Sequence, residues 1–282
     1  MERPDSDAAA GVDLVLPEFD EQAEPPPRHR WGRWVFLLLV LALIATAGLI
    51  WRYDVHMTPH TTAATPEPPA FSVQLLEVTP GTAVPATGGA VPGVPAAQTA
   101  FVDRVSGHTD IPRRVLTAYL HAQAVLAAGA PACHLSWTML AGVGWVESQH
   151  GEWHGDSVTA TGEEATPIIG PALDGSAGMQ KIGDTDHGRL DGDTVWDHAV
   201  GPMQFLPATW LVWGVRASGD GKPADPQDID DAALTAGRYL CAQGGDLATP
   251  AGWWAATWVY NNSATYGQTV FSGATAYALA SR

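Results

Sequence analysis

Glu147 is the residue of this chain best suited to acid–base chemistry. It is the only ionisable side chain in the apolar run that begins at Leu135. In a helix, Leu140, Val143 and Gly144 would share one apolar face with it. Burial on that face, near the negative end of the helix dipole, raises the pKa of a carboxyl group. Glu147 would then keep a proton near neutral pH, as a general acid must. The alternative is a side chain that reaches solvent at the helix end.

Two further groups of polar residues can converge on this acid. Ser148 follows it directly, and Gln204, which can donate and accept hydrogen bonds, lies in a segment rich in Gly and Pro. Tyr260 and Asn261 end a Trp-rich stretch, with Tyr266 close behind. Such hydroxyl, amide and aromatic groups around one acid suit a sugar, which stacks on flat rings and offers neutral hydrogen-bonding groups. Taken singly, Gln204 also fits a loop filler and Tyr260 a core residue.

Helices must position these residues. Ser136 predicts the N-cap of the helix that carries Glu147, and Gly151 predicts its stop. Further helical patterns cover 110–129, 207–213, 230–241 and 252–260. Between them, 152–199 is rich in Gly and Asp and lacks periodicity, which predicts an irregular lobe of functional or mobile character. No long alternating pattern appears, so we expect a mostly helical domain with this lobe inserted.

The first hundred residues have a different character. Residues 1–30 are acidic and Pro-rich and predict a disordered cytoplasmic tail. The uncharged stretch within 31–52 is long enough for a transmembrane anchor, and the arginines before it predict a cytoplasmic N-terminus. The alternative is a signal peptide cleaved near Ala47, which would give a secreted protein. Either way, the Pro/Ala/Thr-rich spacer 53–104 and the domain 105–282 would lie outside the cytoplasm.

Two features of the composition limit the possible binding partners and the oxidation state of the cysteines. The formal net charge is −16 with sparse basic residues, so a nucleic-acid partner is excluded and an anionic substrate must be held by local contacts. The two cysteines, Cys133 and Cys241, both fall on the oxidising side, which favours a disulfide between them. The alternative is two reduced, buried thiols.

Within the spacer, the stretch that starts at Phe71 fits either an extended linker or a strand that docks on the domain.

Four motifs occur in an order that carries a resemblance: Glu147–Ser148, Gly201–Pro207, Asp231–Leu240 and Tyr260–Asn261. This set resembles the lytic murein transglycosylases, most closely the membrane-bound type B branch in its actinobacterial, membrane-anchored form. The resemblance covers roughly 105–277 and implies a lysozyme-like (α+β, mostly α) domain that acts on peptidoglycan glycan strands. It implies no cofactor, and proteins of cell-wall synthesis or division are candidate partners.

The resemblance also assigns roles to the candidate residues. Glu147 matches the single catalytic acid, Ser148 and Gln204 match positions that line the saccharide cleft, and Tyr260 with Asn261 matches a pair beside the acid. The implied reaction cleaves the MurNAc–GlcNAc β-1,4 bond without water. Glu147 protonates the bridging oxygen and then, as a base, helps the C6 hydroxyl close a 1,6-anhydro ring, an exception to the usual pair of carboxylates.

No metal site is expected. Type B relatives can carry an EF-hand-like calcium loop before the helix that starts near Asp231. If Asp220 and the glycine after it hold the fifth and sixth positions here, Arg216 takes the first, Ser218 the third and Gln227 the twelfth, which removes most anionic ligands.

A second acidic run, Asp184–Asp193, lacks the EF-hand spacing. It suggests a substrate-side loop held by turns of Asp side chains with the backbone, with a weak metal site as the alternative. The histidines show no zinc spacing and fit surface or packing positions.

Two other functions compete with the transglycosylase reading. A hydrolytic muramidase needs a second carboxylate, and the irregular lobe offers candidates: Glu152, Asp156, Glu163, Glu164 and Asp174. A non-catalytic, membrane-anchored protein that binds or scaffolds peptidoglycan would need none.

Overall fold

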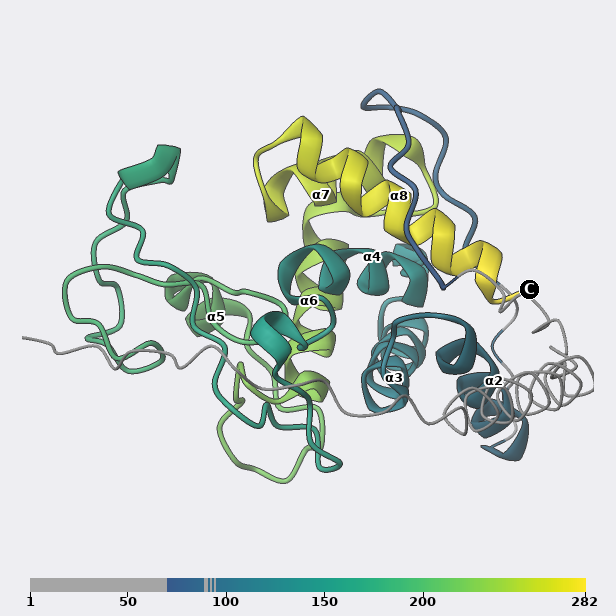
Figure 1. Ribbon diagram of the computed structural model, residues 1–282, viewed down its shortest axis with the longest axis horizontal. Helices are drawn as coiled ribbons and strands as arrows, with labels where there is room; N and C mark the ends of the chain where they lie inside the picture. The colour runs from purple at the N-terminus through teal and green to yellow at the C-terminus, as the bar shows by residue number, and fades with distance from the viewer. Residues whose placement is uncertain (1–69, 89–90, 92, 94) are drawn as a thin grey trace, which may run out of the picture. The chain divides into compact units, whose positions relative to one another are not determined.

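The computed structural model describes residues 70–88, 91, 93 and 95–282 (Figure 1). The predicted cytoplasmic tail and membrane anchor lie outside the described residues. The described residues belong to one compact unit. In the part of the chain that is described, no helix has the length and apolar character needed to cross a membrane.

The described chain is mostly helical, as the sequence predicts. Its α-helices are α2 (Pro95–His108), α3 (Arg113–Gly129), α4 (Trp137–Ser148), α5 (Pro207–Trp213), α6 (Ile229–Gly244), α7 (Pro250–Tyr260) and α8 (Ala264–Ala280). Between α4 and α5 lies the irregular lobe, which contains short 3₁₀ turns at Trp153–Gly155 and Ser176–Gly178. Among the described residues, β-structure is limited to isolated bridges, most of them in this lobe.

Helix α4 lies at the centre of the core, between α3 and α8. Two glycines allow both neighbours to approach closely. A Cβ atom on Gly142 would lie 2.6 Å from the carbonyl oxygen of Val270 in α8, and one on Gly144 would lie 2.0 Å from the hydroxyl of Tyr119 in α3. Larger side chains at these positions would push the helices apart. Ser136 caps α4 as predicted, accepting a hydrogen bond of 3.2 Å from the backbone N–H of Met139.

The compact unit includes residues that the sequence analysis assigns to the spacer. Helix α2 begins at Pro95, and its side chains Phe101 and Val102 are buried in the core. The extended segment 70–88 lies beside α8 (Figure 1), where the ring of Phe71 stacks on Tyr277 with centroids 5.3 Å apart. The segment docks on the domain without forming a strand.

Cys133 and Cys241 form a disulfide, as predicted from their compartment. It links the 3₁₀ turn Pro131–Cys133, between α3 and α4, to the C-terminal half of α6. The bridge closes a loop with a sequence separation of 108. In the chain-entropy account, such a loop contributes about 4–5 kcal/mol to stability.

Candidate active site

Glu147 lies in the last turn of α4, one residue before the helix ends. Its side chain lines two cavities that meet at this residue, of about 260 Å³ and 630 Å³. Burial raises the pKa of its carboxyl group to about 7, although a hydrogen bond from the hydroxyl of Tyr266 to Oε1 (2.6 Å) acts in the opposite direction. Glu147 is therefore partly protonated near neutral pH, the state in which it can first give and later take a proton.

The end of α4 is fixed by Ser148 and the three residues after it. The Ser148 hydroxyl donates to the carbonyl of Pro202 (2.7 Å) and accepts from the N–H of Gly151 (2.8 Å). Gln149, His150 and Gly151 have positive φ angles of 53°, 64° and 84°. The helix thus stops at Ser148 rather than near Gly151, because the left-handed region begins two residues earlier than predicted. The donor and one acceptor site of the Ser148 hydroxyl are used inside the protein, and its contact with substrate stays a prediction.

His150 connects this turn to the core. It is buried, and burial lowers its pKa to about 3, so the ring is neutral. The Tyr277 hydroxyl donates to Asp110 (2.8 Å), so His150 Nε2 must donate to Tyr277 (2.8 Å), and Nδ1 accepts from Tyr119 (3.2 Å). This chain of bonds defines a single tautomer for His150.

Gln204, Tyr260 and Asn261 line the 630 Å³ cavity together with Glu147. The Tyr260 hydroxyl donates to the carbonyl of Met203 (2.8 Å), which ties the end of α7 to the segment before α5. Gln204 has a φ of 47°, an uncommon value for a residue with a side chain, and its amide nitrogen donates to the carbonyl of Gly201 (2.9 Å). Strain of this kind is typical of residues held for a function.

The tyrosines form a stacked pair beside the acid. The rings of Tyr260 and Tyr266 lie nearly parallel, at 7°, with centroids 6.3 Å apart. Phe205 and Tyr239 pack on Tyr260 at 5.8 Å and 5.9 Å. The structure thus brings the predicted site residues together around Glu147, from the helices α4, α7 and α8 and the segment before α5.

The remaining lining residues of the 630 Å³ cavity carry no clear signal in the sequence. Leu173, Met179, Gln180 and Ile182 of the irregular lobe line the same cavity, as does Tyr239 of α6. Nothing in the spacing of the lobe residues marks them, because the lobe has no periodicity. Tyr239 belongs to one of the motifs quoted above, yet its helical pattern is equally typical of a core residue.

The two cavities around Glu147 contain no second carboxyl group among the described residues that line them. Asp156 lines a different cavity, which shares Trp153 with the 260 Å³ cavity. Asp174 accepts a hydrogen bond from the N–H of Ser176 in a local turn. Glu163 accepts a hydrogen bond from Thr161. Glu164 is buried, and neither of its carboxylate oxygens has a hydrogen-bond partner among the described residues. Glu152 lies outside both cavities as well.

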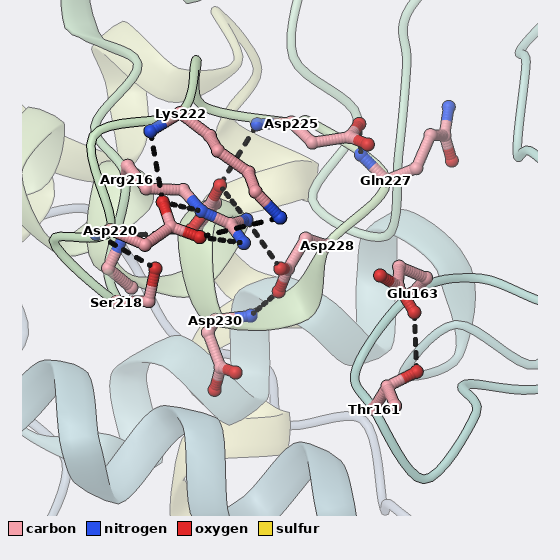
Figure 2. A network of polar contacts seen from close by, with 12 residues as sticks. Thr161, Glu163, Arg216, Ser218, Asp220, Lys222, Asp225, Gln227, Asp228 and Asp230 are labelled. Carbon is pink, nitrogen blue, oxygen red and sulfur yellow. Dashed lines mark hydrogen bonds and ion pairs between the residues drawn. The ribbon is translucent and has the colours of Figure 1, made fainter.

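Arg216 occupies the centre of the loop that was compared with an EF-hand (Figure 2). Its guanidinium contacts Asp228 at 2.8 Å, Asp231 at 2.9 Å and Asp220 at 3.1 Å. Asp231 also accepts the backbone N–H groups of Ala217 and Asp225. Arg216, which stands at the first ligand position of the EF-hand-like loop, thus supplies a positive charge to these carboxylates in place of a metal ligand.

The acidic run of the lobe is held mainly by its own backbone. Asp184 accepts the N–H groups of Asp186 and Gly188, as expected for Asp-backbone turns. Ligand atoms of Asp184, Asp186 and the buried Asp197 lie within 4.8 Å of one another. Asp197 accepts both the N–H and the hydroxyl of Thr185. The carboxylates therefore order this loop, and the weak metal site considered above stays untested.

Comparison with known proteins adds two similar structures. No protein-family model matches the chain, and no curated protein matches it in sequence. Two structures of the Escherichia coli lytic transglycosylase Slt35 are similar to it. The complex with bulgecin A has 15% sequence identity and a TM-score of 0.37, and covers 64% of this chain and 78% of that chain. The complex with calcium has 16% identity and a TM-score of 0.38, with coverage of 64% and 79%. At this level of similarity, a function must be derived from the site itself.

Proposed function

We propose that this chain is a peptidoglycan lytic transglycosylase that uses Glu147 as its single acid and base. The observation that carries the proposal is the solitary carboxyl group with a pKa of about 7 at the meeting point of two cavities. A hydrolase of the usual kind needs a second carboxylate to attack the sugar or to activate water. None of the described residues that line these cavities supplies one.

The reaction balances with one acid. Protonated Glu147 gives its proton to the oxygen between N-acetylmuramic acid and N-acetylglucosamine, and the bond from that oxygen to C1 of the muramic acid breaks. The N-acetyl oxygen of the same sugar stabilises the positive charge at C1. The carboxylate of Glu147 then takes the proton of the C6 hydroxyl while the C6 oxygen forms its bond to C1. Glu147 ends protonated, and the product is a 1,6-anhydro sugar formed without water.

The surrounding residues fit this cycle. The Tyr266 hydroxyl stabilises the carboxylate that exists between the two proton transfers. The parallel rings of Tyr260 and Tyr266 lie beside the acid, and Gln204 and Asn261 offer neutral amides at the same cavity. Neutral groups suit a saccharide on a protein with a net charge of −16, which repels anionic polymers at long range.

Mass spectrometry of released muropeptides tests the proposal. Sacculi are incubated with the full-length chain or with its Glu147→Gln variant, which keeps the shape of the side chain but cannot transfer protons. Anhydro-muropeptides that disappear with the variant are the expected result. Hydrated ends, heavier by one water, would identify a muramidase instead. Binding of sacculi without any release by the parent chain would identify a non-catalytic binding protein.

We also propose that residues 31–52 anchor the domain at the cytoplasmic membrane, with the compact unit outside. The uncharged apolar stretch and the arginines before it support this orientation. Protease added outside intact cells should then remove the domain and leave a membrane-bound N-terminal fragment. A secreted domain without that fragment would indicate signal cleavage.

A further inference from the structure

A third cavity, of about 630 Å³, lies between α8 and the extended segment beside it. Residues 75–79 form one wall, and Thr265, Gln268, Thr269 and Ser272 of α8 form the other. Neither the predicted site nor the proposed reaction uses this cavity.

The segment that forms the first wall is held in place by hydrogen bonds to the domain. The N–H of Leu76 donates to the hydroxyl of Ser272 (2.9 Å), and the amide of Gln268 donates to the carbonyl of Val78. Further along, the indole of Trp254 in α7 donates to the carbonyl of Thr82 (3.0 Å). The cavity is therefore preformed, because both of its walls are fixed before any ligand arrives.

The cavity continues the candidate active site. Thr269 lines both this cavity and the 260 Å³ cavity. The 260 Å³ cavity in turn shares Glu147 with the cavity lined by Gln204, Tyr260 and Asn261. The three cavities therefore follow one another across the surface, from the irregular lobe past the acid to the extended segment. A polymer that crosses Glu147 and leaves by the α8 side reaches the segment next.

The chemistry of the walls suits a neutral sugar. Thr265 carries a hydroxyl, and Gln268 has an amide carbonyl besides the N–H that bonds Val78, and both can pair with sugar hydroxyl and N-acetyl groups. The Thr269 hydroxyl already donates to the carbonyl of Thr265. Leu75 is 69% exposed and Leu76 38% exposed, and both line the cavity. Large apolar side chains exposed beside a polar cavity often mark a binding surface. Among the described residues of the lining, Glu77 is the only charged one, so the cavity disfavours the carboxylates of stem peptides.

We propose that the segment 75–79 and α8 form a distal subsite that binds sugars of the glycan strand beyond the bond at Glu147. This subsite rests on the proposed function, since its ligand is the same strand. In this proposal, the extended segment that precedes α2 takes part in substrate binding. It also predicts that long strands bind more tightly than short ones.

The test compares strands of two lengths on the full-length chain. Leu75 and Leu76 are both replaced by Asp, and Leu279→Asp on α8, also an exposed leucine (56%), serves as the matched control. All three leucines are exposed, so thermal unfolding should be almost unchanged. The substrates are peptidoglycan strands sorted into tetrasaccharides and strands of about twelve sugars or more.

The expected result is a KM for long strands about tenfold higher in the double variant, with kcat unchanged. The KM for tetrasaccharides should not change, and the Leu279→Asp control should match the parent on both substrates. An unchanged KM for long strands in the double variant would overturn the subsite while leaving the proposed function intact. A parent that cleaves no strand, and whose Glu147→Gln variant binds none, would overturn both.

Discussion

The hydrogen bond from Tyr266 to Glu147 offers a direct test of the proposed role of Glu147 as an acid with a raised pKa. It joins a phenol to a carboxyl group over 2.6 Å, and it opposes the larger effect of burial, so that the pKa of Glu147 is about 7 with both effects present. A hydrogen bond to a charged group contributes about 1.5–3 kcal/mol, and one pKa unit corresponds to about 1.4 kcal/mol. Tyr266→Phe should therefore raise the pKa of Glu147 by about one to two units.

The sign of the effect on activity follows from the role of Glu147. The first step of the proposed reaction needs the protonated acid, so activity should fall as pH rises through the pKa of Glu147. In Tyr266→Phe this basic limb should move to higher pH by about one unit or more. The maximal rate should fall, because the carboxylate formed during the cycle loses its stabilising partner. Tyr239→Phe is the matched control, since Tyr239 lines the same cavity without contacting Glu147.

Two measurements check the prediction. Release of anhydro-muropeptides from sacculi, followed between about pH 5 and 10, locates the basic limb, and ¹³C NMR of the labelled glutamate carboxyl groups gives the pKa without turnover. A basic limb that stays in place or moves to lower pH in Tyr266→Phe would refute the assignment of Glu147 as an acid tuned by burial and Tyr266.

Three further predictions concern stability. Burial raises the pKa of Glu164 to about 8 from an ordinary 4.5, so the folded state binds the extra proton and stability should fall as pH rises from about 4.5 to 8. Glu164→Gln should weaken this fall in urea titrations, and a slope equal to that of the parent would contradict the assignment. Arg216→Met leaves the buried Asp228 and Asp231 without their cation and should cost about 2–4 kcal/mol, whereas Arg113→Met, at an exposed ion pair, should cost less than about 1 kcal/mol. Equal losses in the two variants would contradict a structural role of Arg216. Gly142→Ala should cost about 1–3 kcal/mol because its Cβ meets a backbone oxygen at 2.6 Å, whereas Gly107→Ala, with open space around it, should be neutral or stabilising.

Helices α3 to α7 and the position of Glu147 could be predicted from the sequence because their signals are local, whereas α2 and α8 were not predicted. Ser136 as a cap, the apolar face that includes Glu147 and the helical spacing of the later segments depend on neighbours within a few residues. The end of α4 was harder to predict. Its stop begins at Gln149, where a residue other than glycine adopts a positive φ. The bonds of Ser148 and His150 to distant residues support that conformation, and a local pattern does not contain them.

The lobe itself could be predicted, but its place at the cavity could not, for the same reason, and the docking of the extended segment was left open between two alternatives. Met179 and Gln180 line the same cavity as Glu147, but the lobe has no periodic pattern that would mark them. The docking of the segment 70–88 depends on Ser272, Gln268 and Trp254, which lie far along the chain. Composition alone assigns such a Pro- and Thr-rich stretch to a linker.

A site with one acid places a demand on its framework that a two-carboxylate site does not. In the proposed reaction, Glu147 must reach the bridging oxygen in the first step and the C6 hydroxyl in the second, so its carboxyl group has to stay in one place while its charge changes. The structure meets this demand from three sides. Tyr266 holds the carboxyl group itself, Ser148 holds the helix end against the carbonyl of Pro202, and His150 ties the following turn to α3 and α8. Because His150 stays neutral well below the pKa of Glu147, this framework does not change over the pH range in which the acid works. The pH dependence of the reaction should therefore report on Glu147 rather than on the framework that holds it.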